Sequence, residues 1–115
     1  MVGHTGNMHA TIKAIECLDQ QLAHLYYEVV QRKKGSLFIT ADYGNAEAMY
    51  SPRTGKPLTS HTCNLVPFIA VSIAPHHKLL PLPKQLSAIA PYLLRYLNLP
   101  VPPEMMQQGY TSIQD

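Results

Sequence analysis

The feature that most constrains the fold is a long helical repeat of apolar residues near the start of the chain. Between Met8 and Lys34 the apolar side chains recur at helical spacing and fall on one stripe: Ile12, Ile15, Leu18, Leu22, Leu25, Tyr26 and Val29. Asn7 precedes this repeat as a predicted N-cap, and Gly35 follows it as the predicted C-terminal stop. The stripe is wide enough to lie on a β-sheet, so the rest of the chain is expected to supply one.

Two short apolar segments, 36–41 and 67–73, are predicted to be strands, each typical of a strand buried on both faces of a parallel sheet. A second helix is predicted from a cap at Ser87 through Leu97, and one helical turn is predicted at 46–50. This order predicts α/β layering in a single partial domain over residues 1–115. Because two strands cannot form a stable sheet with both faces covered, further strands are expected from outside the chain or from another molecule.

Composition narrows the class of protein. Charged residues make up 14% of the 115 residues and the formal net charge is +2, which argues against a nucleic-acid or membrane surface. The longest apolar stretch is far shorter than the roughly 20 residues that span a bilayer, and the first seven residues do not resemble a signal peptide. Cys17 and Cys63 are expected to be reduced thiols. We therefore predict a soluble, cytoplasmic protein.

Three polar residues occupy places where α/β proteins hold their sites. His4 lies in a glycine-rich segment before a helix, Asp42 follows a predicted strand, and His61 lies in the loop before the next strand. Imidazole and carboxylate groups are suitable ligands for Zn²⁺ or Mn²⁺. Residues 42–45 are also typical of a turn, because Asp and Asn side chains bond to the local backbone. His61 would also fit an ordinary loop. From these residues alone, a purely structural role therefore stays open.

The sequence around these residues resembles a known family. Three segments look like successive signatures of cofactor-independent phosphoglycerate mutase, a family of the alkaline phosphatase superfamily. They are MVGHTGN at 1–7, ITADYGNAE at 39–47 and TSHTCNLVP at 59–67. The stretch 89–105 also looks like the end of that family's chain. The resemblance implies the C-terminal portion of a three-layer, alkaline-phosphatase-like domain with a mostly parallel sheet.

The family interconverts 3-phosphoglycerate and 2-phosphoglycerate in glycolysis, using two Mn²⁺ ions and a serine that carries the phosphoryl group. By resemblance, His4 and His61 would hold one ion and Asp42 the other. Tyr43 stands where the family usually has a second histidine ligand, and a phenol with a pKa near 10 is a poor ligand at neutral pH. The resemblance therefore implies weakened or altered binding of the second ion, with Tyr43 as a possible altered ligand.

The resemblance also implies that several parts of the enzyme are absent from this chain: the nucleophilic serine, the N-terminal aspartate ligands and the substrate-binding domain. No catalytic residue is therefore assigned, and the chain is expected to be a truncated product, a mis-called start or a gene remnant that is inactive alone. Three alternatives stay open. They are another phosphotransferase of the superfamily, a simple metal-binding module, and a non-catalytic remnant that binds a partner or itself through uncovered sheet edges.

Overall fold

The computed structural model describes residues 1–73 and 80–106 and consists of two compact units, Met1–Ile73 and Ala74–Asp115. The first unit holds the 3₁₀ helix η1 (Val2–Thr5), helix α1 (Met8–Leu25), the π-helix η2 (Tyr26–Arg32) and strands β1 (Ser36–Thr40) and β2 (Phe68–Ser72). The second holds η3 (Leu86–Ala88), α2 (Ile89–Tyr96) and η4 (Pro103–Met105). Within the described ranges, no helix is long and apolar enough to cross a membrane.

The predicted long helix is confirmed, and so is its N-cap. The side chain of Asn7 accepts a hydrogen bond from the backbone N–H of Ala10 at 3.0 Å, which satisfies one free amide of the first turn. The predicted stop at Gly35 is displaced by one residue. Lys34 takes the left-handed conformation with φ of 57°, and the Gly35 N–H then donates to the carbonyl of Val29 at 2.7 Å.

The end of this helix departs from α-helical geometry. From Tyr26 to Arg32 the backbone is a π-helix, and beyond it the N–H of Lys33 donates to the carbonyl of Glu28, five residues back, at 3.2 Å. A wider turn delays the return of each side chain to the same face. Val30 is consequently the fully buried residue of this segment, whereas a spacing of 3.6 residues predicts Val29.

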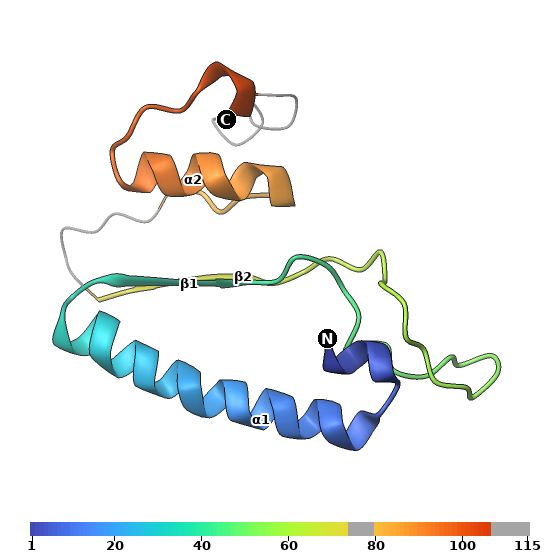
Figure 1. Ribbon diagram of the computed structural model, residues 1–115. Coiled ribbons are helices and arrows are strands. Elements are labelled where there is room, and N and C mark those ends of the chain that lie inside the picture. Colours follow the sequence, from blue (N-terminus) through green and yellow to red (C-terminus); the bar gives the residue numbers. More distant parts are fainter. Residues whose placement is uncertain (74–79, 107–115) are drawn as a thin grey trace. The chain divides into compact units, whose positions relative to one another are not determined.

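The two predicted strands form, but they pair antiparallel. Ser36 lies opposite Ser72 and Thr40 opposite Phe68, and Figure 1 shows the two strands side by side with α1 along one side of the pair. The α/β class is confirmed, whereas the interpretation of 36–41 and 67–73 as parallel strands buried on both faces is wrong for this pair. Antiparallel strands tolerate a solvated face. Thr40 and Ile69 are exposed on opposite faces of the pair, because Ile69 lies opposite Ile39, the neighbour of Thr40.

The apolar stripe of α1 stays half-exposed. η2 packs against β1, but the apolar side chains of α1 itself remain accessible: Ile12 at 47%, Ile15 at 53%, Leu18 at 61% and Leu25 at 48%. A surface of this kind in a stable helix is normally covered by a partner surface. The described sheet is therefore too small for the helix that accompanies it.

The segment between the strands is a long hairpin and contains no helical turn at 46–50. Tyr50 pairs with Pro57, the N–H of Leu58 donates to the carbonyl of Met49 at 2.7 Å, and the hairpin base closes at the bridge between Gly44 and Thr62. Figure 1 shows this green-to-yellow segment extending beyond the ends of β1 and β2. The Thr11 hydroxyl lies 3.9 Å from the Met49 sulfur, so buried contacts join the hairpin to α1.

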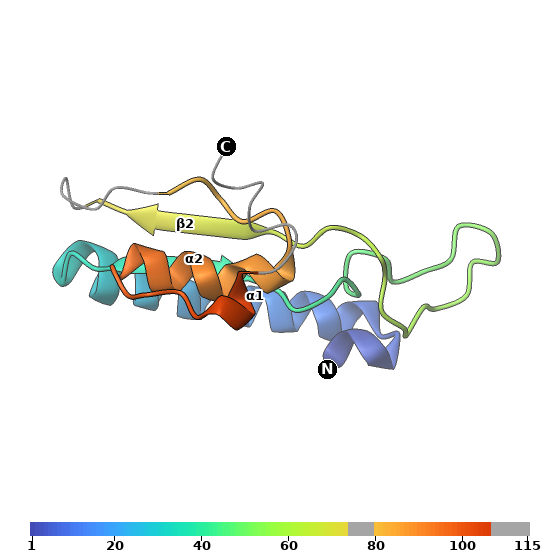
Figure 2. The same ribbon diagram turned by 90° about the horizontal axis from the view of Figure 1, so that it is seen from above.

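The second unit contains the predicted second helix, with two differences at its ends. Ser87 lies inside η3 and makes no side-chain cap to the backbone; its hydroxyl accepts from the amide of Gln85 at 2.9 Å. The helix ends on Asn98 with φ of 57°, where the N–H of Leu99 donates to the carbonyl of Leu94. Asparagine tolerates the left-handed conformation that this ending requires. Figure 2 shows the same ribbon from above, with α2 labelled.

Candidate metal-binding site

Three of the predicted chemistry-bearing segments meet at one end of the first unit. His4 lies in η1, Tyr43 follows β1, and His61 lies on the returning arm of the hairpin. The His4 ring centroid lies 5.1 Å from that of His61 and 5.9 Å from that of Tyr43. Residues separated by tens of positions therefore form one cluster, which we call the imidazole cluster: His4, Tyr43 and His61.

Two hydrogen bonds fix the ring of His4. Its Nδ1 lies 2.5 Å from the carbonyl oxygen of Thr59, and its Nε2 lies 3.1 Å from the hydroxyl of Tyr43. A carbonyl oxygen can only accept, so Nδ1 carries the proton and donates. In the neutral ring Nε2 then carries the lone pair and accepts from the Tyr43 hydroxyl. A backbone carbonyl on one ring nitrogen is the usual way in which proteins orient the other nitrogen toward a metal.

The ring of His61 is held by stacking. It lies over the Tyr43 ring with a centroid separation of 3.6 Å and an interplanar angle of 18°. Within the described ranges, no hydrogen bond to the His61 ring is present. Its orientation therefore depends on Tyr43 beneath it and on the backbone that carries it.

Asp42 does not join the imidazole cluster. Its side chain is exposed, and it lines a neighbouring cavity of about 540 Å³ together with Gly3, Ile15, Tyr43 and Glu47. Across residues 1–73 and 80–106, no group of three or more histidine, cysteine, aspartate or glutamate side chains is placed to hold a metal ion. The metal-ligand roles of His4, Asp42 and His61 accordingly stay predictions.

A network around Glu47 was missed by the reasoning from the sequence. The Glu47 carboxylate accepts from the hydroxyl of Thr62, from the side-chain amide of Asn64 at 3.1 Å and from the backbone N–H of Asn45 at 2.8 Å. These hydrogen bonds join the turn after β1 to the arm that carries His61. The available signal was the concentration of hydrogen-bonding side chains on both sides of Tyr43 and His61.

The network stabilises the ionised form of Glu47. The hydrogen bond from Thr62, followed by backbone hydrogen bonding and the bond from Asn64, lowers the pKa of this carboxyl from 4.5 to about 2. The side chain is fully exposed, so water screens the effect and the direction is what matters.

We expect the hairpin base to loosen only in strong acid. Because the folded-state pKa of Glu47 is depressed, its stabilising contribution is present above pH 4.5 and is lost as pH falls toward 2. The backbone amide signals of Gly44 and Thr62 should therefore titrate with a midpoint near 2 in an NMR pH series. Glu47→Gln should abolish this transition, and a midpoint near 4.5 in the wild type would contradict the network.

Two glycines allow the close approach of these segments. A Cβ built on Gly44 would fall on the Thr62 hydroxyl and the Glu47 carboxylate, and one built on Gly3 would fall on the amide of Asn45. The amide of Asn45 in turn donates to the carbonyl of Ser60 at 2.9 Å. The packing around the imidazole cluster therefore requires glycine at positions 3 and 44.

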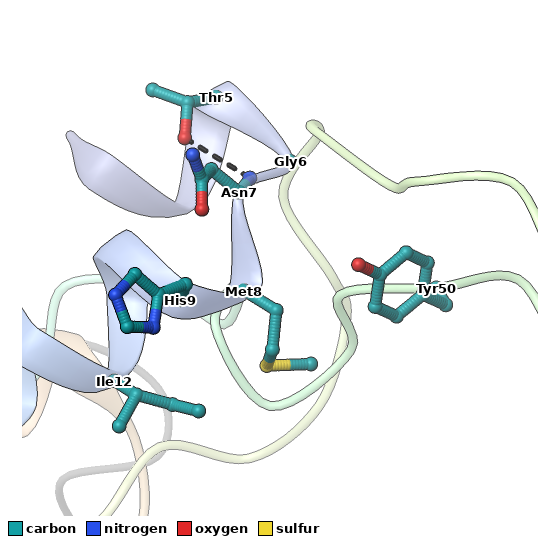
Figure 3. A pocket seen from close by; sticks show the side chains of 7 residues that line it. All are labelled: Thr5, Gly6, Asn7, Met8, His9, Ile12 and Tyr50. Carbon is teal, nitrogen blue, oxygen red and sulfur yellow. Dashed lines mark hydrogen bonds between the residues drawn. The ribbon is translucent and has the colours of Figure 1, made fainter.

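A second cavity, of about 600 Å³, lies where α1 begins (Figure 3). Its lining combines the start of α1 with Tyr50 of the hairpin, and the hydroxyl of Thr5 accepts from the N–H of Asn7 at 3.1 Å on its rim. His9 is the single imidazole in this lining. One ligand does not make a metal site, so this cavity is a weaker candidate.

The side chains present fit part of a metal centre. His4 offers an oriented Nε2, and His61 lies beside it, so two nitrogen donors of a type that Mn²⁺ and Zn²⁺ accept are close together. A complete first coordination shell needs further protein ligands. The described residues therefore match a shared site better than a self-contained one.

Comparison with known proteins gives one family and a consistent set of relatives. Residues 1–101 match the family model described as "Metalloenzyme superfamily". A 2,3-bisphosphoglycerate-independent phosphoglycerate mutase of Clostridium perfringens is 49% identical over 105 residues, covering 91% of this chain and 20% of the relative. Its counterparts in Francisella philomiragia and Francisella tularensis are 49% identical over 110 residues, with the same coverage. The resemblance found in the motifs is confirmed, and the chain spans about a fifth of the length of these relatives.

Proposed function

Because this chain belongs to the Metalloenzyme superfamily, we propose that it supplies part of the metal-dependent site of a phosphoglycerate mutase that needs no bisphosphoglycerate. The single observation that carries the proposal is the meeting of His4, Tyr43 and His61 from three distant segments. Its substrate would be phosphoglycerate, after the printed function of the relatives. The remaining ligands and the nucleophile would come from the portion that the relatives have in addition.

In this proposal His4 and His61 bind one ion, and Asp42 binds the second. The ions, which we take to be Mn²⁺, would neutralise charge on the phosphoryl oxygens and on the attacking group. The Thr59 carbonyl would orient His4 by accepting a hydrogen bond from its Nδ1–H, which leaves Nε2 for the metal. The hydroxyl of Tyr43 donates a hydrogen bond to the same Nε2 and therefore competes with the metal for its lone pair.

The proposal includes a cytoplasmic location for the protein. The free thiols of Cys17 and Cys63 suit a reducing compartment.

Calorimetric titration of the purified 115-residue chain with Mn²⁺, and separately with Zn²⁺, tests the proposal. We expect a weak single-site signal, because two imidazoles form an incomplete coordination shell. His4→Ala and His61→Ala should each reduce the affinity by roughly 10-fold or more, since each removes a direct ligand.

His9→Ala is the matched control, because His9 is an exposed imidazole on α1 outside the imidazole cluster. It should leave the titration unchanged. No binding by the wild type, or an equal loss in all three variants, would contradict the metal-binding role. The same purified chain is expected to show no conversion of 3-phosphoglycerate with Mn²⁺, and turnover would contradict a shared site.

A second candidate function, partner binding, is favoured by the half-exposed stripe of α1. An apolar surface of this kind promotes association, with itself or with a complementary chain. We expect the chain to elute above its 12.8 kDa monomer mass in size-exclusion chromatography at high concentration. Leu18→Glu should shift it toward the monomer, because Leu18 is 61% exposed on this stripe. Exclusively monomeric elution of the wild type would count against self-association.

A further inference from the structure

We propose that Glu47 is a positioning residue for the imidazole of His61, which it holds by fastening the Thr62–Asn64 segment to the turn after β1. The inference rests on the proposed metal-binding function and deepens it. Glu47 contacts neither His61 nor any other member of the imidazole cluster in the hydrogen bonds described, so it would act through the backbone.

The first step in the argument is that both carboxylate oxygens of Glu47 are used. Oε1 accepts from the Thr62 hydroxyl and from the Asn64 amide, and Oε2 accepts from the backbone N–H of Asn45. Three donors converge on one acceptor-only group. A carboxylate satisfies such an arrangement, whereas the amide of glutamine would present an N–H₂ to at least one donor.

The second step is that hydrogen bonds to the turn after β1, including one to Glu47, lie on both sides of His61 in the sequence. On one side, the Ser60 carbonyl accepts from the Asn45 side chain at 2.9 Å. On the other side, Thr62 bonds to Glu47 and its backbone N–H donates to the Gly44 carbonyl at 2.6 Å. Both neighbours of His61 are therefore tied to the turn that also carries Tyr43.

The third step is that the His61 ring has little else to fix it. It is exposed, and it stacks on Tyr43 at a centroid separation of 3.6 Å. If the arm detaches from the turn, the two rings separate, because they lie on the two segments that Glu47 joins. Loss of the carboxylate should therefore change the position of the His61 ring more than it changes α1 or the strands.

Proton NMR of the imidazole ring provides the test. Stacking on Tyr43 should move the His61 ring signals upfield of those of exposed His24. We expect Glu47→Gln and Thr62→Val each to remove at least half of this displacement, while Thr62→Ser, which keeps the hydroxyl, retains it. The double variant should be no worse than Glu47→Gln alone, because the bond that Thr62→Val removes is one of those that Glu47→Gln already disturbs. Glu16→Gln, an exposed helical glutamate, is the matched control.

The metal arm uses the same variants, titrated with Mn²⁺ alone. Glu47→Gln should weaken binding by roughly 10-fold, as is typical when a group supporting a ligand is lost. If the wild type binds no Mn²⁺ but the NMR effects occur, the proposed function fails and the positioning role stands. If Glu47→Gln leaves the His61 signals at their wild-type positions, or the wild type shows no upfield displacement, the positioning role is overturned. Unchanged far-UV circular dichroism confirms that the variants remain folded.

Discussion

Tyr43→His is expected to raise the affinity of this chain for Mn²⁺ by roughly 10- to 100-fold, the range by which support of a metal site commonly changes binding. Two effects act in the same direction. The substitution removes the phenol hydroxyl that occupies Nε2 of His4 at 3.1 Å. It also adds a third imidazole beside His4 and His61, at the position next to Asp42, where a protonated phenol is a poor metal ligand. Calorimetric titration with Mn²⁺ measures the change.

Tyr43→Phe separates the two effects. It removes the hydroxyl but keeps a ring of nearly the same shape stacked on His61. We expect a small gain in affinity, well below that of Tyr43→His. Equal gains in the two variants would mean that position 43 contributes no ligand, and a loss of affinity in Tyr43→His would contradict the assignment of this position to a metal site.

Gly44→Ala should destabilise the first unit and disconnect the arm that carries His61. A methyl group at this position would meet the Thr62 hydroxyl and the Glu47 carboxylate, both of which belong to the network that closes the hairpin base. Overpacking of this kind costs typically about 1–3 kcal/mol. Urea denaturation followed by far-UV circular dichroism should show a lower midpoint, and the His61 ring signals should lose their displacement.

Gly55→Asn is the control for Gly44→Ala. Gly55 lies near the hairpin tip with φ of 66°, and no atom lies within 4 Å of a Cβ built there. Asparagine tolerates the left-handed conformation, so the change should be near neutral. If the two variants were equally stable, the close approach at Gly44 would not be structurally important.

The local elements were predictable from the sequence because their signals are local. Apolar spacing and Asn7 identified the long helix and its first cap, and the strands lie within the predicted segments. The π-helical end was not predictable, since a spacing of 3.6 residues assumes one turn geometry throughout and places Val29 where Val30 is buried. The antiparallel pairing of β1 and β2 was not predicted, because a short apolar segment has the same residue pattern whether it pairs parallel or antiparallel.

The candidate site was also predictable only in part. The motifs pointed to His4 and His61, and the structure brings these two rings to within 5.1 Å. What the sequence could not supply is the carbonyl of Thr59, since every residue has a carbonyl and only the folded hairpin selects this one. The Glu47 network was not predicted for a related reason: its two side-chain partners, Thr62 and Asn64, lie 15 and 17 positions away, across the hairpin.

The sequence separation of the site's contacts affects how this molecule responds to a ligand. The hydrogen bonds of His4 span 39 and 55 positions, so they join η1 to the turn after β1 and to the returning arm of the hairpin. Closing such long loops costs conformational entropy that forming the local hydrogen bonds of α1 does not. An ion that binds only the closed form would therefore stabilise the whole first unit by mass action. The proposed metal binding would then make the thermal stability of this unit rise with the concentration of the ion.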